Sequence, residues 1–224
     1  MLSTTGMSAA SGKEKPVVGP GNQLLKINSL SFVPTPYDTN AYNILLHVET
    51  EPKGDDFQGF LKDTNQPDGP RYAGQVGKVR FHPYPYKDNI LPNGNEISRD
   101  TEVMKGMVFL AEALDKRKEL DNIQANTIEE FMAACNGLFS NSNYVNMCLG
   151  SKEWINKDGY INDDLFLPKI SKGNVPIETI DAEPSKLIIF NTDDKNHYKK
   201  AIKKESDEVS QFEPAKASGN DFDL

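Results

Sequence analysis

Cysteine, tryptophan and histidine are scarce in this chain of 224 residues, which has two cysteines, one tryptophan and three histidines. Cys135 and Cys148 form neither a metal-ligand pair nor a redox motif, and their apolar neighbours favour small core residues. The histidines are scattered, and the sequence has no phosphate-binding loop, nucleophile elbow or dinucleotide fingerprint. We therefore expect a protein with no metal site, no cofactor and no catalytic activity.

Long hydrophobic runs are also missing. No run approaches the roughly 20 apolar residues that a membrane span requires, and the first 20 residues lack the pattern of a secretory signal. Hydrophobic residues make up 37% of the chain, and its mean hydropathy is -0.58. These observations predict a cytoplasmic protein that has no contact with a membrane.

Acidic residues exceed basic ones by 33 to 25, which at first argues against a nucleic-acid ligand. Much of the excess lies in residues 205–224, which contain six carboxylate side chains and only one lysine, Lys216. The preceding 204 residues therefore carry only about -3 of the total net charge of -8. Local patches on this nearly neutral part decide what it binds.

Residues 205–224 have too few apolar side chains to offset the entropy of ordering, so they predict a disordered acidic tail. The last four residues add one aromatic and one aliphatic side chain to this tail. They are Asp221, Phe222, Asp223 and Leu224. Either a chain terminus varies freely in sequence, or these four residues bind a basic groove with an apolar pocket on a partner protein.

Alternating apolar residues predict three strands in the first half of the chain. The alternation shifts phase within residues 24–33, which indicates a strand with a bulge or strong bend. Residues 42–48 give the clearest alternation, and residues 51–72 form a long loop rich in Gly, Pro, Asp and Asn. The third strand is expected over residues 75–86.

The second half predicts two helices followed by a hairpin. The first helix is expected over residues 105–120 with Asp100 as its cap, and the second from Thr127 to an end at Gly137. The hairpin spans residues 145–167 and turns at Lys157, Asp158 and Gly159, and residues 187–190 are a possible further strand.

Three strands, a helical excursion and two further strands are the order of an OB-fold, a five-stranded Greek-key barrel with its helix between strands three and four. Other small barrels share this strand count. We therefore expect a mainly β protein with an α insertion and an OB-fold-like barrel. The expected parts are a flexible arm (1–21), the barrel domain (22–192), a basic segment (193–204) and the disordered acidic tail (205–224).

The expected third strand carries the clearest binding signal, because cations and aromatic residues alternate along it. Cations follow phosphates and aromatic rings stack on exposed bases, so the pattern suits single-stranded nucleic acid. An ordinary solvated face of an antiparallel sheet is the alternative. Lys78, Arg80, His82, Tyr84 and Tyr86 occupy every second position, so their side chains are expected on one face of the strand. The residues of this group are Arg71, Tyr72, Lys78, Arg80, His82, Tyr84, Tyr86 and Lys87.

The hairpin adds a weaker group of candidates, Lys152, Trp154 and Tyr160. A single tryptophan is more often a core residue, but one on this hairpin of an OB-fold has the position to stack on a base. Residues 195–204 contain five lysines, which suit a solvated helix or linker, or a segment that contacts phosphates. The adjacent carboxylates Asp163 and Asp164 suit a solvated hairpin end better than a metal site.

Four segments resemble the single-stranded-DNA-binding proteins of crAss-like bacteriophages. They are residues 54–60 (GDDFQGF), 74–79 (GQVGKV), 156–160 (NKDGY) and 164–169 (DLFLPK). The resemblance spans residues 24–190 and the last four residues. It implies an OB-fold, a role in phage DNA replication or recombination in the host bacterial cytoplasm, and no catalytic activity.

The end of the chain departs from the acidic run closed by Pro-Phe that is usual in bacterial single-strand binders. Here Leu224 is last and Phe222 lies two positions inward. We therefore expect residues 221–224 to recruit phage-encoded replication or recombination proteins rather than host ones.

The sequence thus predicts a non-enzymatic protein that coats single-stranded DNA. One alternative is an adaptor whose barrel binds a polypeptide, and a second is a metal-dependent nuclease that uses Asp163 and Asp164.

Overall fold

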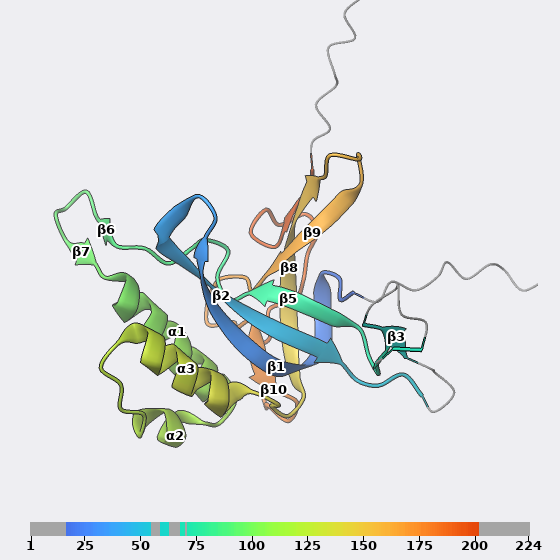
Figure 1. The fold of residues 1–224 in the computed structure, drawn as a ribbon, viewed down its shortest axis with the longest axis horizontal. Helices are drawn as coiled ribbons and strands as arrows, with labels where there is room; N and C mark the ends of the chain where they lie inside the picture. The colour runs from blue at the N-terminus through green and yellow to red at the C-terminus, as the bar shows by residue number, and fades with distance from the viewer. Residues whose placement is uncertain (1–16, 55–58, 63–67, 70, 202–224) are drawn as a thin grey trace, which may run out of the picture.

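A mixed seven-stranded sheet forms the centre of the molecule, with helices gathered on one side of it (Figure 1). The computed structural model describes residues 17–54, 59–62, 68–69 and 71–201. The strands of the sheet are β1 (Gly21–Thr35), β2 (Asp38–Thr50), β5 (Val76–Arg80), β8 (Val145–Ile155), β9 (Ile161–Phe166), β10 (Ile177–Thr179) and β11 (Tyr198–Lys199). The described chain is therefore mainly β, as the sequence predicts.

Two small two-stranded sheets lie outside this central sheet. One joins β3 (Phe60–Leu61) to β4 (Arg71–Tyr72), and the other joins β6 (Asn89–Ile90) to β7 (Glu96–Ile97). The helices are α1 (Arg99–Ala113), α2 (Arg117–Asp121) and α3 (Ile128–Phe139). None of the helices in the described part of the chain is long and apolar enough to cross a membrane.

Five strands of the central sheet pair in a closed succession. β1 is antiparallel to β2, β2 is antiparallel to β5, and β5 runs parallel to β9. β9 is antiparallel to β8, and β8 pairs antiparallel with the first residues of β1. The three helices lie between β5 and β8 in the chain, which is the position that the sequence predicts.

β1 pairs with two strands, β8 and β2, because it bends. Its first residues pair with β8, whereas residues from Leu25 onward pair with β2, and the register shifts between Ile27 and Ser29. Leu25 and Ile27 are fully buried, and Leu30 joins them in the core after the shift. The bulge expected from the phase shift of the apolar residues is confirmed.

β2 and β5 differ in how well they follow the sequence prediction. Ile44, Leu46 and Val48 of β2 are buried on one face, as expected. β5, however, ends at Arg80, so the prediction of a strand reaching Tyr86 is wrong. Pro83 and Pro85 follow, and a proline offers no N–H to a neighbouring strand. The chain returns to β2 only at Tyr86, whose N–H and carbonyl both bond to Tyr42.

The helical region begins earlier and is more divided than expected. Ser98 is the N-cap of α1 and Asp100 lies in its first turn, so the prediction of Asp100 as the cap is wrong. Asp115 has a φ of 54°, a left-handed conformation that separates α1 from α2. The prediction of one helix over residues 105–120 is therefore also wrong.

α3 begins as the sequence predicts, because the Thr127 hydroxyl accepts a 3.2 Å hydrogen bond from the Glu130 N–H. The Glu130 carboxylate in turn accepts from the Asn126 N–H at 2.9 Å. The helix continues through Gly137 to Phe139, so Gly137 does not end it. Phe139 is fully buried, and α3 packs against β1.

The hairpin of β8 and β9 is confirmed, with its turn at residues 156–160. The expected strand over residues 187–190 is reduced to a single bridge between Leu187 and Val175. β10 and β11, which the sequence did not predict, both pair with β8. β11 belongs to the predicted basic segment, whose described part therefore packs on the sheet.

The packed region begins earlier than expected. Val18 is only 4% exposed and donates a 3.0 Å hydrogen bond to the Val76 carbonyl, whereas the sequence predicts a flexible arm up to residue 21. The predicted tail over residues 205–224, including the four partner-binding candidates at its end, lies outside the described residues. So do most of the predicted arm and residues 55–58 of the 54–60 segment.

Candidate nucleic-acid interface

A hollow of about 320 Å³ lies where β5, β8, β9 and β11 meet. We call it the Tyr84 groove, after the exposed ring at its edge. Its lining combines three cations with two tyrosines and one carboxylate. The residues that line it are Tyr37, Arg80, Pro83, Tyr84, Pro85, Lys152, Asp164, Phe166 and Lys199.

Arg80 enters the groove at the end of β5, where that strand pairs with Phe166 of β9. Its Nη2 lies 2.8 Å from Oδ2 of Asp164, and both side chains are about one-third exposed (31% each). Asp164 also lies opposite Lys152 in the register of β8 and β9. A carboxylate therefore lies beside two cations of the groove, although no acidic residue interrupts the sequence from Arg71 to Lys87.

Tyr84 offers the groove an aromatic face beside two ammonium groups. Its side chain is 56% exposed. Nζ of Lys169 lies 5.4 Å and Nζ of Lys199 lies 5.9 Å from the centroid of its ring. Nδ1 of His82 lies 2.9 Å from the Tyr84 carbonyl oxygen, which helps to fix the backbone between the two prolines. An exposed ring with two ammonium groups over it combines the aromatic surface on which a base stacks with the cations that contact phosphates.

The β8–β9 hairpin extends from the groove and carries the second predicted group. Lys152 is exposed and lines the groove, and Trp154 lies two residues further along the same strand. Trp154 is 50% exposed, so it is not the core residue that a single tryptophan usually is. Tyr160 is exposed at the turn, where the Asn156 side chain accepts hydrogen bonds from the Asp158 and Tyr160 N–H groups.

Lys199 reaches the groove because β11 packs against β8. The Ser151 N–H donates a 2.8 Å bond to the His197 carbonyl, and the Tyr198 hydroxyl donates to the Glu153 carboxylate. Gly150 permits this approach, since a Cβ there would lie 2.8 Å from the His197 carbonyl oxygen and 2.7 Å from the Phe166 ring. The space beside Gly150 is therefore filled by this chain's own residues, the backbone of His197 and the ring of Phe166.

The other predicted residues do not join the groove. Arg71 and Tyr72 form β4, which precedes β5, whereas Arg80 is at the far end of that strand. Nη1 of Arg71 donates to the Gly59 carbonyl at 3.0 Å, and Nζ of Lys62 lies 4.8 Å from the Tyr72 ring. Lys78 is exposed on β5 two residues before Arg80.

His82, Tyr86 and Lys87 line a different hollow, between the residues that follow β5 and α1. The prediction that Lys78, Arg80, His82, Tyr84 and Tyr86 share one face is therefore wrong, because β5 ends at Arg80. Burial and the charge of Glu102 raise the pKa of the Tyr86 hydroxyl far above its ordinary value. Burial, and then the charge of Lys169, lower the pKa of His82.

Sequence reasoning did not select three residues of this surface for DNA binding. Tyr37 is 77% exposed in the turn between β1 and β2. Lys169 follows β9, and Lys199 was noted only as part of a basic stretch. The sequence signal for Tyr37 is an aromatic residue next to Pro36, in the short segment between the first two expected strands, whereas the position of Lys199 depends on a two-residue pairing with β8.

The alternative of a metal-dependent nuclease finds no geometric support at Asp163 and Asp164. Asp164 faces Arg80, while Asp163 lies on the opposite face of β9 and accepts a 2.5 Å bond from the Ser151 hydroxyl. Within the described ranges, no three His, Cys, Asp or Glu side chains gather closely enough to hold a metal ion. Burial raises the pKa of Cys135 to about 12 and that of Cys148 to about 11, which suppresses thiolate chemistry.

Comparison with models of protein families, with curated proteins and with solved structures gives no match to this chain.

Proposed function

We propose that this protein is a non-enzymatic single-stranded-DNA-binding protein that holds the strand across the Tyr84 groove. The observation that carries the proposal is the exposed Tyr84 ring with the ammonium groups of Lys169 and Lys199 over it. Arg80 and Lys152 line the same groove and supply further charge for phosphates. Aromatic platforms within a cationic groove are the usual means of binding single strands without sequence preference.

We further propose that the fold is an OB-fold. Support comes from the strand succession β1-β2-β5-β9-β8, which returns to β1, and from the helices between β5 and β8. OB-folds bind oligonucleotides on the face of their second and third strands and on the loops after the first and fourth strands. In the proposed fold, Arg80 ends the third strand, and Tyr37 and Tyr160 lie in those two loops.

In this proposal a strand of DNA runs from Tyr84 over Lys152 toward the hairpin, where Trp154 and Tyr160 provide further stacking surfaces. Lys78 on β5 extends the cationic side of this path. Arg80 exchanges its partner Asp164 for a phosphate, or binds both at once through its several N–H donors. The protein then protects exposed strands during phage DNA replication or recombination in the host cytoplasm, and residues 221–224 recruit partner proteins.

The decisive experiment is fluorescence anisotropy of a labelled oligothymidine, as a single strand and in a duplex with oligoadenosine. We expect tight binding of the single strand and weak binding of the duplex. Tyr84→Ala should weaken binding roughly fivefold or more, the value of one lost base stack. The matched control is Tyr144→Ala, which lies immediately before β8 and eight residues from Lys152 in the chain.

Other outcomes separate the alternatives. No binding of the single strand at low salt would exclude the proposal and leave the adaptor that binds a polypeptide. Equal binding of oligouridine would extend the proposal to RNA, since stacking tolerates either sugar. Cleavage of the labelled strand with magnesium or manganese, lost in the double variant Asp163→Ala and Asp164→Ala, would show a nuclease instead.

A further inference from the structure

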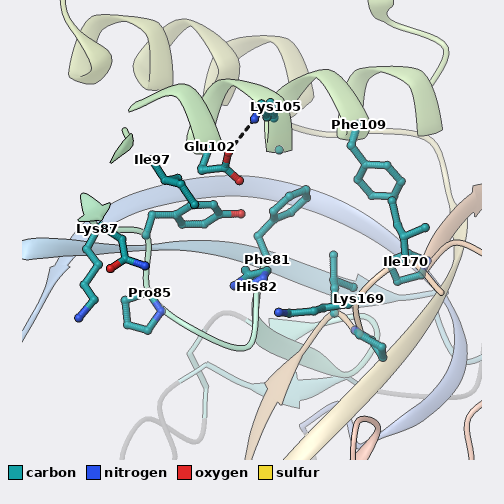
Figure 2. A pocket seen from close by; sticks show the side chains of 16 residues that line it. Phe81, His82, Pro85, Lys87, Ile97, Glu102, Lys105, Phe109, Lys169 and Ile170 are labelled. Carbon is teal, nitrogen blue, oxygen red and sulfur yellow. Dashed lines mark hydrogen bonds and ion pairs between the residues drawn. The ribbon is translucent and has the colours of Figure 1, made fainter. Parts of the chain in front are cut away.

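A second, larger hollow of about 440 Å³ lies next to the Tyr84 groove, and the proposed function does not use it. Figure 2 shows it between α1 and the segments that follow β5 and β9. We call it the α1 cavity. Its walls are mostly apolar and include the rings of Phe81, Tyr86 and Phe109. Its volume is within the range of roughly 300–1,000 Å³ that is typical of small-molecule pockets.

The α1 cavity and the Tyr84 groove share residues at their boundary. Pro85 lines both, and Lys169 lines the cavity while its Nζ lies over the Tyr84 ring. The His82 ring lies between them, 6.0 Å from the Tyr84 ring and 5.6 Å from the Tyr86 ring, measured between centroids. Three aromatic rings therefore lead from the groove into the cavity.

The charges of the α1 cavity are found on its rim. Lys87, Lys105 and Lys169 contribute three ammonium groups, and the only carboxylate among its lining residues, Glu102, lies 2.7 Å from Nζ of Lys105. An anionic ligand with a flat apolar part fits such a site, with its charge at the rim and its ring inside. A nucleotide has this chemistry, because its phosphate is anionic and its base stacks on aromatic side chains.

We propose that the α1 cavity takes one unstacked base of a DNA strand whose neighbouring nucleotides lie in the Tyr84 groove. This inference rests on the proposed function. Lys169 contacts the phosphate at the boundary, and the base enters past His82 to lie among Phe81, Tyr86 and Phe109. One nucleotide of each bound strand then differs from the others, because its base is held inside the protein.

Gly106 of α1 provides a way to block the cavity without touching the groove. A Cβ at Gly106 would lie 3.0 Å from the Phe81 ring and 3.2 Å from the Tyr86 hydroxyl oxygen. The longer side chain of Gly106→Leu therefore occupies the cavity. The matched control is Gly137→Leu on α3, where a Cβ meets nothing within 4 Å. Thermal unfolding of both variants checks that they fold.

The test uses the shortest oligothymidine that binds the full chain tightly, with one base at a time removed to leave an abasic site. With the unmodified protein we expect one position at which base removal weakens binding roughly fivefold or more. Gly106→Leu should lose a similar factor with the intact oligonucleotide and no longer respond at that position. Gly137→Leu should behave as the unmodified protein.

Two results would overturn the inference while leaving the proposed function intact: equal effects of base removal at every position, or full DNA affinity in Gly106→Leu. An acidic, aromatic peptide that binds the protein but not this variant, while DNA binding is unchanged, would make the cavity a peptide site. If Gly106→Leu does not fold, Lys87→Ala replaces it, with exposed Lys118→Ala as the control. Lack of any binding of the intact oligonucleotide would instead overturn the proposed function.

Discussion

Asp164 is the one carboxylate among the residues that line the Tyr84 groove. Its carboxylate bonds to Arg80 at 2.8 Å and lies across the strands from Lys152. A partly exposed ion pair of this kind adds little stability, typically about 0–1 kcal/mol. In the proposed complex with DNA its larger effect is electrostatic, because a negative charge next to two cations repels an approaching phosphate and occupies Arg80.

Asp164→Asn should therefore bind single-stranded DNA several-fold more tightly than the unmodified protein at low salt. The amide keeps the shape of the side chain but removes the repulsion, so Arg80 becomes available to a phosphate. Anisotropy titrations measure the effect, and Asp163→Asn on the opposite face of β9 is the matched control. Weaker binding by Asp164→Asn would show instead that the carboxylate orients Arg80 for the DNA.

His82 links the stability of the protein to pH. Burial, reinforced by Lys169, lowers its folded-state pKa below the value of about 6.5 that it has in an unfolded chain. Between these two pKa values the unfolded chain binds more protons than the folded one. The neutral imidazole therefore contributes fully to stability above about pH 6.5, and this contribution is lost as the pH falls below that value.

Thermal unfolding at about pH 7.5 and about pH 5.5, on either side of the unfolded-state pKa, measures this effect. The unmodified protein should lose more of its Tm on acidification than His82→Gln, because glutamine takes up no proton. Equal losses in the two proteins would show that other groups, such as the carboxylates, account for the acid sensitivity.

At the level of elements, the contact between β11 and β8 brings Lys199 into the Tyr84 groove. The contact has only two residue pairs in register, supported by the bonds of Ser151 and Glu153 to residues 197–201. It depends on Gly150, where any side chain would clash with the backbone of His197 and the ring of Phe166.

Gly150→Ala should therefore reduce both stability and DNA affinity. Overpacking of this kind typically costs about 1–3 kcal/mol, and displacement of β11 would move Lys199 away from Tyr84. Urea unfolding and anisotropy measure the two effects. Gly137→Ala, in open space on α3, should instead be neutral or stabilise the protein by about 0.5–1 kcal/mol. Unchanged values for Gly150→Ala would show that β11 is free to shift.

Local patterns in the sequence predicted the elements that depend on local interactions. The alternation in β2, the phase shift in β1 and the Thr127 cap all have their cause within a few residues, and each is confirmed. The end of β5 at Arg80 was missed because alternation alone continues to Tyr86. Pro83 and Pro85 indicate that the strand ends before them, because a proline has no N–H for a neighbouring strand. The alternation nevertheless predicts that the side chains beyond Arg80 share its face.

The candidate site was predictable only in part, because it is assembled from distant segments. Arg80, Tyr84 and Lys152 were selected from sequence, and the structure brings them together. Asp164 lies beside Arg80 because β9 runs parallel to β5, and no local pattern indicates that pairing. Lys199 depends in the same way on the pairing of β11 with β8.

At the level of the whole molecule, a net charge of -8 accompanies the proposed anionic ligand. Binding must then depend on the few cations at the groove rather than on the overall charge. The four that line it or flank Tyr84 are Arg80, Lys152, Lys169 and Lys199.

If these four cations neutralise four phosphates, the logarithm of the affinity should fall with the logarithm of salt concentration with a slope of about -3. Lys199→Ala should make this slope less steep by roughly 0.7, the contribution of one neutralised phosphate. Anisotropy titrations over a salt series measure both slopes, and the surface variant Lys118→Ala is the control. A slope near zero would indicate an apolar ligand and favour the adaptor.

The parallel pairing of β5 with β9 also has a consequence for how the protein is made. Domains fold as units while the chain grows from its N-terminus, and β9 is the last of the five strands in the closed succession to be synthesised. Until residue 166 is available, β5 lacks its second neighbour, and Arg80 and Asp164 are not yet together. A nascent chain that stops before β9 therefore contains only two of the four cations, Arg80 and Lys152, and has no groove. It acquires the groove only after β9 has paired with β5 and the later residues Lys169 and Lys199 have been added.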